Sequence, residues 1–135
     1  MIVEPDIKRL QVCQAQFKQI QPDLYLPVGR GLSQALLAVS LQGRTRAARD
    51  WLEAAIKEKA PGPVLCADTD ILFEPSLQLD PLTIFRQISR IVPVIVFWAG
   101  KYENGVLSYA VPEHQHYRVW RKPEVEIKGV NDVLS

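Results

Sequence analysis

Two uninterrupted apolar runs constrain the fold of this chain more than any other feature. The run from Val64 to Ala67 ends directly at Asp68, and the run from Val92 to Trp98 is mostly β-branched and aromatic. Strands that are apolar on both faces are typical of parallel sheets covered by helices on both sides. Segments with helical spacing alternate with these runs, so we predict a three-layer α/β fold with a mostly parallel sheet.

Apolar residues spaced by three and four predict the helices. The first has Pro5 in its first turn and one apolar face formed by Ile7, Leu10, Cys13, Phe17 and Ile20. Three more helices are expected over residues 32–41, over 45–59 with Thr45 as its N-cap, and from Asp80-Pro81 onward. Short strands are expected at residues 23–28 and 125–127, and Gly29 to Gly31 is expected to form a tight turn.

The C-terminal third changes character, because Asn104-Gly105 stands between two extended segments. Asn-Gly is a strong signal for a two-residue β-hairpin turn. We therefore predict a C-terminal β-hairpin after the parallel sheet. A polar, aromatic stretch from Glu113 to Trp120 follows it.

Chain length, composition and net charge exclude several classes of protein. The chain has 135 residues, 47% of them hydrophobic, and a formal net charge of +1. This length predicts one domain over residues 1–135, and the apolar content argues against disorder. A near-neutral charge argues against binding nucleic acid by bulk charge. With two cysteines, no secretory signal pattern and apolar runs too short for a membrane helix, we expect a cytoplasmic protein.

The segment from Gly29 to Ser33 is the candidate phosphate-binding loop, with Gly29, Arg30, Gly31 and Ser33 as its site residues. It stands between an expected strand and an expected helix, where backbone N–H groups cradle phosphates. Leu32 occupies the place of the lysine that such loops use. The interpretations left open are ATP or GTP binding and a plain strand-to-helix turn.

Asp68 and Asp70 are the candidate magnesium ligands. Asp68 follows an apolar strand, as the carboxylate of a Walker-B segment does, and Asp70 lies two residues beyond it. The alternative is that these acids only end the strand and cap the next segment.

Two further groups of residues are candidates for binding. His114 and His116, beside Glu113, have the spacing of a partial metal site, but no further Cys or His completes it and surface polar packing is the better explanation. Two basic clusters are candidates for contact with phosphates, DNA or a protein: Arg44, Arg46 and Arg49, and Arg118, Arg121 and Lys122. Tyr117 and Trp120 interleave with the second cluster.

Several ordered motifs between Val64 and Arg118 resemble one family. They are Asp70–Leu77 (DILFEPSL), Leu79–Leu82 (LDPL), Ile88–Arg90 (ISR), Val94–Gly100 (VIVFWAG), Leu107–His114 (LSYAVPEH) and Tyr117-Arg118. Together they resemble the BrxF family, the small P-loop-containing component of type III BREX bacteriophage-defence systems. The resemblance implies a P-loop NTPase-like fold with Asp68 in the Walker-B strand. It also implies partners of the BREX type, namely a large ATPase, an alkaline-phosphatase-like protein and a DNA methyltransferase.

The chain departs from the family pattern at its front end, where Leu32 replaces the phosphate-loop lysine and the loop is short. We therefore expect a minimal, degenerate P-loop-like domain. It would act as an accessory or regulatory subunit of an anti-phage system through protein contacts. The alternatives are a magnesium-dependent ATP- or GTP-binding protein or weak NTPase of the same system, and a subunit that contacts DNA through the basic clusters.

Overall fold

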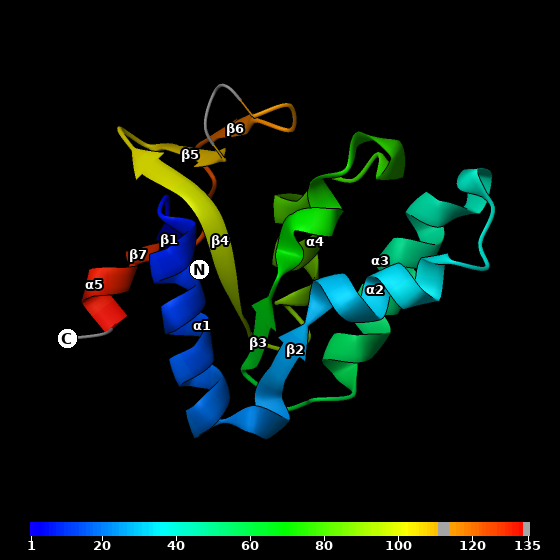
Figure 1. Ribbon diagram of the computed structural model, residues 1–135, viewed down its shortest axis with the longest axis horizontal. Coiled ribbons are helices and arrows are strands. Elements are labelled where there is room, and N and C mark those ends of the chain that lie inside the picture. Colours follow the sequence, from blue (N-terminus) through cyan, green and yellow to red (C-terminus); the bar gives the residue numbers. More distant parts are fainter. Residues whose placement is uncertain (111–113, 134–135) are drawn as a thin grey trace.

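The computed structural model describes residues 1–110 and 114–133. Over these residues the chain forms a mixed, mostly parallel sheet with helices on both sides (Figure 1). The strands are β1 (Ile2–Glu4), β2 (Tyr25–Pro27), β3 (Val64–Ala67), β4 (Val94–Glu103), β5 (Val106–Tyr109), β6 (Arg118–Arg121) and β7 (Lys128–Gly129). The helices are α1 (Ile7–Ile20), α2 (Val28–Leu36), α3 (Arg44–Lys57), α4 (Pro81–Ile88) and α5 (Val130–Val133), with short 3-10 helices η1 (Pro22–Leu24), η2 (Leu41–Gly43), η3 (Thr69–Phe73) and η4 (Pro75–Leu77).

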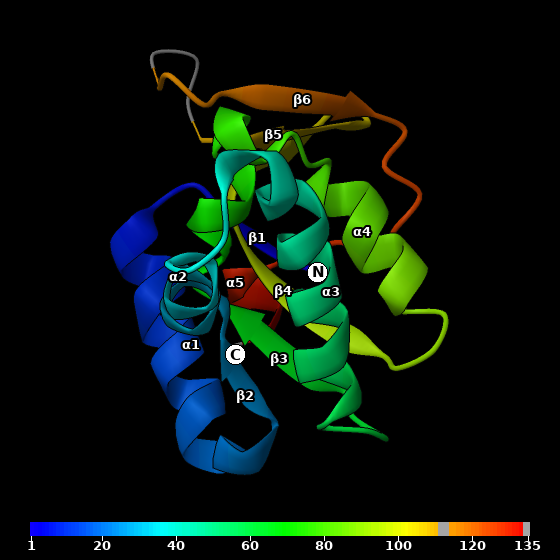
Figure 2. The ribbon, with the colours of Figure 1, turned by 90° about the vertical axis from the view of Figure 1, so that its right-hand side faces the viewer.

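The parallel part of the sheet has the order β2-β3-β4-β1-β7. The register places Ile2 beside Phe97 and Leu65 beside Ile95, so β4 lies between β1 and β3. The predicted three-layer α/β arrangement with a mostly parallel sheet is confirmed. Figure 2 shows the layers, with α1 on one side of the sheet and α3 and α4 on the other.

Each face of the sheet has its own apolar core. Leu10 and Cys13 of α1 pack with Leu65 and Phe97 on one face. The other face carries the larger core, to which α2, α3, α4 and the inner side of the hairpin contribute. Cys66 lies in this second core, whereas Cys13 lies in the first. Both cysteines are buried, as the sequence predicts, and neither forms a disulfide. No helix among the described residues has the length and apolar content needed to cross a membrane.

The predicted hairpin is confirmed. Strands β4 and β5 pair antiparallel around Asn104-Gly105, with Glu103 opposite Val106, and β5 then pairs with β6. Strand β4 is ten residues long, because its second half leaves the parallel sheet to form this hairpin. The strand expected at residues 125–127 is wrong: the short strand is Lys128–Gly129, which pairs with β1.

Helix α1 is present as predicted, but it begins at Ile7 with Asp6 as its N-cap residue, so Pro5 lies before its first turn. The predicted apolar face is also longer than the face that is buried. Ile7 and Ile20 are 60% and 75% exposed, whereas Leu10 and Cys13 are buried. A helix of 14 residues spans about 21 Å, which is longer than the strands of three or four residues that it covers. Both ends of α1 therefore extend beyond the sheet.

The start of α3 also differs from the prediction. Gly43 is its N-cap residue and makes no side-chain cap bond, so the prediction of Thr45 as the N-cap is wrong. Instead, the Thr45 hydroxyl donates to the carbonyl of Leu77, at 2.7 Å. This bond ties the start of α3 to η4.

Candidate functional site

Open parallel sheets bind ligands outside the carboxyl ends of their strands, at the point where the strand order reverses. Here that point lies between β1 and β4, because the chain runs from β1 to the edge strand β2 and from β4 past β1 to β7. The start of α1, which follows β1, is therefore where a site is expected. The candidates from the sequence follow other strands: the start of α2 follows β2, and the segment from Asp68 to Asp70 follows β3.

The predicted tight turn at Gly29 to Gly31 is wrong. Helix α2 begins at Val28, directly after Pro27 of β2, so Gly29, Arg30, Gly31 and Ser33 are all helical. Pro27 has an extended backbone conformation and is the N-cap residue, which lets the strand pass into the helix without a loop. In addition, β2 is an edge strand and lies away from the reversal point.

The two glycines of α2 serve close packing. A Cβ atom at Gly29 would lie 2.9 Å from the backbone carbonyl oxygen of Asp68, and one at Gly31 would overlap the ring of Trp51. Glycine is needed where another group approaches the backbone this closely. Close packing therefore explains both glycines of the pattern that predicts a phosphate loop.

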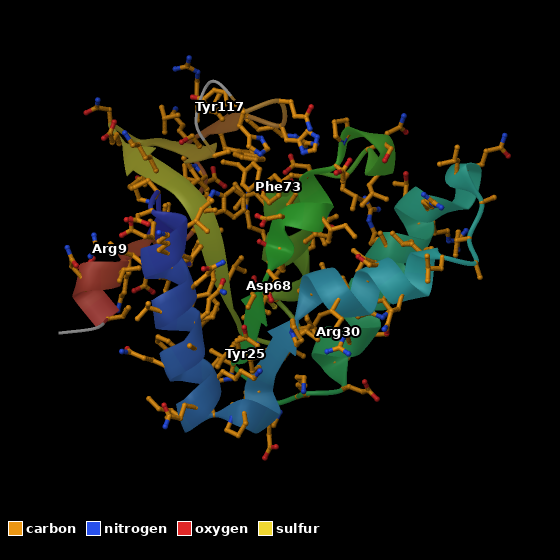
Figure 3. All side chains as sticks on the ribbon, viewed as in Figure 1. Arg9, Tyr25, Arg30, Asp68, Phe73 and Tyr117 are labelled. Atoms are coloured by element: carbon orange, nitrogen blue, oxygen red, sulfur yellow. The ribbon has the colours of Figure 1, made fainter. Side chains whose placement is uncertain are left out.

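The other candidate loop residues do not converge on Asp68. Leu32 is fully buried in the core, so the residue at the lysine position faces inward. Arg30 and Ser33 are exposed, and Arg30 extends from α2 away from Asp68 (Figure 3).

Asp68 and Asp70 each have a different protein partner. Asp68 has a left-handed backbone conformation, with φ of 54°, and accepts a hydrogen bond from the buried amide of Gln14 at 3.4 Å. Asp70 accepts from the hydroxyl of Tyr109 at 2.9 Å. Within residues 1–110 and 114–133, no group of three or more His, Cys, Asp or Glu side chains is arranged to hold a metal ion. Magnesium binding by the two acids stays a prediction.

Both acids affect a neighbouring tyrosine. Burial raises the pKa of Tyr109 well above its ordinary value, and the Asp70 carboxylate raises it further. Burial also raises the pKa of Tyr25, with a smaller contribution from Asp68. Figure 3 shows Tyr25 on β2 and Asp68 directly after the end of the neighbouring strand β3. In each case a phenol held neutral lies near a carboxylate.

The start of α1 lies at the reversal point itself, and carboxylates of the chain occupy it. The Asp6 carboxylate accepts hydrogen bonds from the backbone N–H groups of Lys8, at 3.0 Å, and Arg9, at 3.4 Å. The Glu4 carboxylate, which is buried, accepts from the N–H of Asp6 at 2.8 Å and pairs with the Arg9 guanidinium at 3.3 Å. Arg9 also donates to the side chain of Asn131. These N–H groups would otherwise be the place for an anion such as a phosphate.

Sequence reasoning missed this location, because β1 has only three residues and shows no periodicity. One signal was present: Asp6 stands immediately before the apolar spacing of α1, which is typical of an N-cap.

Parts of four of the motifs that carry the family resemblance, namely DILFEPSL, LDPL, LSYAVPEH and Tyr117-Arg118, meet beyond the carboxyl end of β3. The Arg118 guanidinium donates to the backbone carbonyls of Leu79, at 2.7 Å, and Phe73, at 3.3 Å. The indole N–H of Trp120 donates to Asp80 at 3.1 Å. These bonds hold the hairpin onto the segment from η3 to α4, so the motifs form one structural unit.

An aromatic cluster fills this unit. The rings of Phe73 and Tyr109 stack with centroids 3.6 Å apart, and Trp98 and Trp120 pack edge-on against Phe73. Large aromatic side chains contribute strongly to packing. The hairpin is therefore a fixed cover over the carboxyl end of β3.

The two histidines and the arginines of the basic clusters lie in different parts of the structure. The backbone N–H of His116 donates to Nδ1 of His114 at 3.0 Å, and Glu113 lies outside the described residues. Arg118 is held by the two carbonyls of the hairpin unit, whereas Arg46 and Arg49 are exposed on α3.

Comparisons of the chain with protein-family models, with curated proteins and with solved structures found no match in any of the three. The family resemblance therefore stays a prediction.

We predict that Gly31→Ala destabilises the fold by about 1–3 kcal/mol, because the added methyl group overlaps the Trp51 ring. The double variant Gly31→Ala/Trp51→Leu should be more stable than the sum of the two single changes implies, since the smaller side chain makes room. Urea unfolding of the four proteins measures this coupling. Ser33→Ala, on an exposed position of the same helix, is the matched control and should change stability by less than about 0.5 kcal/mol. Additive effects at positions 31 and 51 would contradict the packing explanation.

We predict that stability falls at alkaline pH through Tyr109. Because the folded state raises the pKa of this phenol above its ordinary value of 10, the stability linked to the neutral form is complete below pH 10 and is lost as the pH rises further. The free energy of unfolding of the wild-type chain should therefore fall more steeply than that of Tyr109→Phe, by up to about 1.4 kcal/mol per pH unit. Urea unfolding at about pH 8 and about pH 11 measures the difference. Equal losses in both proteins would show that the phenol does not titrate in this way.

Proposed function

We propose that this chain is a degenerate P-loop NTPase-like domain that acts as an accessory or regulatory subunit through protein contacts. By its resemblance to the BrxF family, we place it in a cytoplasmic, type III BREX-like anti-phage system. In this proposal the domain keeps the α/β framework of its family and does not hydrolyse nucleotide.

The observation that carries the proposal is the occupied start of α1. In a phosphate-binding fold, the helix that begins at the reversal point offers its free N–H groups to a phosphate. Here the Asp6 carboxylate accepts from the N–H groups of Lys8 and Arg9, and Glu4 lies directly behind it. The Asp6 carboxylate accepts from the donors that an anionic ligand would use and repels its charge, whereas the charge of Glu4 is paired with Arg9.

The start of α2 supports the same proposal. A phosphate loop needs a glycine-rich loop and a lysine that can reach the phosphates. Helix α2 has no preceding loop, and the buried Leu32 occupies the lysine position. Arg30 supplies a positive charge in this region, but it extends away from Asp68.

The hairpin unit supports a role in protein contacts. Arg118, Trp120 and Tyr109 bond to the segment between Asp70 and Asp80, so the family motifs serve to hold a fixed surface in place. A surface that is already ordered loses little conformational entropy on association. The proposed partners are a BREX-type ATPase, the phosphatase-like protein or the methyltransferase of the same system.

We predict that calorimetric titration of the full chain with Mg-ATP or Mg-GTP gives no binding tighter than about 1 mM. The reason is that the Asp6 carboxylate already accepts from the N–H groups of Lys8 and Arg9 at α1, and that Leu32 occupies the lysine position at α2. Asp68→Asn should give the same result as wild type, and Asp23→Asn, an exposed acid on η1, is the matched control. Micromolar binding that Asp68→Asn abolishes and Asp23→Asn preserves would instead establish the nucleotide-binding alternative.

We also predict stoichiometric co-elution of the chain with one of the three proposed partners from the same genome, measured by size-exclusion chromatography of purified proteins. Co-elution should persist after addition of EDTA, because the contact does not depend on Mg-nucleotide. The accessory-subunit proposal fails if none of the three proteins co-elutes with the wild-type chain.

A further inference from the structure

The connection between α2 and α3 carries two large apolar side chains with almost no cover. Leu37 is 82% exposed and Leu41 is 71% exposed. Figure 1 shows this connection as the right-hand tip of the molecule, beyond the edge of the sheet. Exposed apolar side chains that lie close together are typical of interaction sites.

This tip is held in a defined conformation by hydrogen bonds. The N–H of Val39 donates to the carbonyl of Leu36 at 3.1 Å, and the N–H of Gly43 donates to that of Ser40 at 3.0 Å. The Arg44 guanidinium donates to the carbonyl of Val39 at 3.2 Å. The two leucines are therefore presented by a formed segment, and a partner that covers them need not order it.

Positive charge adjoins the leucines. Arg46 and Arg49 are exposed and share one face of α3, three positions apart. Arg46 lies in the first turn of the helix, where the positive end of the helix dipole disfavours a cation. Its nearest acid, Asp50, is 3.8 Å away with both side chains mostly exposed, so the pair is weak. Helix stability therefore does not explain Arg46.

We propose that Leu37, Leu41, Arg46 and Arg49, here called the α2–α3 tip, dock an acidic amphipathic segment of a partner protein. Apolar side chains of that segment would cover the leucines, and its carboxylates would face the arginines. This inference rests on the proposed function, because it names the surface and the partner chemistry of the accessory subunit.

The leucines favour a protein over DNA as the occupant. DNA binding draws on phosphate contacts from the arginines and gives no reason to expose Leu37 and Leu41. A second copy of the chain is also a poor complement. Two of its other exposed apolar residues, Ile20 and Ile91, have Lys18 and Arg90 within two positions in the sequence, so docking them on the tip brings like charges together.

The test uses a synthetic, fluorescently labelled peptide of about 15 residues, long enough to form a helix, with leucines on one face and glutamates on the other. Fluorescence anisotropy measures its affinity for the full chain. Leu37→Ser/Leu41→Ser and Arg46→Glu/Arg49→Glu should each weaken binding about tenfold or more. Ile20→Ser and Arg90→Glu, which change the same residue types on other exposed surfaces, are the matched controls and should bind as wild type does. Circular dichroism and thermal unfolding confirm that each variant folds.

Four outcomes overturn the proposal. They are no binding of the peptide, equal affinity in the tip variants, binding of a DNA duplex that depends on the arginines alone, and self-association that the leucine variant abolishes. Co-elution with the partner separates this inference from the proposed function. If wild type and Leu37→Ser/Leu41→Ser co-elute equally, only the tip is wrong, whereas loss of co-elution in wild type removes the proposed function itself.

Discussion

Hydrogen bonding along β4 is the interaction on which the rest of this structure depends. Over its first half the strand pairs in parallel with β3 and with β1, and over its second half it pairs antiparallel with β5. Its side chains serve both cores, since Phe97 packs with α1 and Trp98 packs in the opposite core. Because one strand carries both pairings, the hairpin has a fixed position relative to the parallel sheet.

That position determines what remains open at the carboxyl edge. The hairpin and the segment from Asp70 to Asp80 close the end of β3 with an aromatic cluster held by Arg118. At the end of β1, the Asp6 and Glu4 carboxylates take the donors at the start of α1. The Lys8 and Arg9 donors at the start of α1 and the end of β3 are thus occupied by the chain itself, which is why the proposal turns from nucleotide chemistry to protein contacts.

The sequence predicts the long, strongly patterned elements well and the short ones poorly. The apolar run of β3, the Asn104-Gly105 hairpin and the presence of helix α1 are confirmed, because each has a local cause in periodicity or turn chemistry. Strands β1 and β7 have three and two residues, so they carry no periodic signal and form only by pairing with β4 and with each other.

The candidate site was harder to predict than the fold. Gly29 and Gly31 look like a turn in the sequence, but their lack of a side chain serves contacts with Asp68 and Trp51 that lie far away in the chain. Ile7 and Ile20 continue the apolar spacing of α1, yet the sheet beneath the helix is too short to bury them. In both cases contacts between residues far apart in the chain determine the conformation or the burial. Local sequence patterns carry no information about such contacts.

Backbone-amide NMR of the full chain, titrated with Mg-ATP, tests the central claim most directly. If the Asp6 carboxylate already holds the donors at the start of α1, the amide resonances of Lys8 and Arg9 should stay in place as nucleotide is added, and so should those of Gly29 and Arg30. Saturable shifts of the Lys8 and Arg9 amides would contradict the account, because they would mean that a phosphate displaces the carboxylate from the position that a phosphate loop provides.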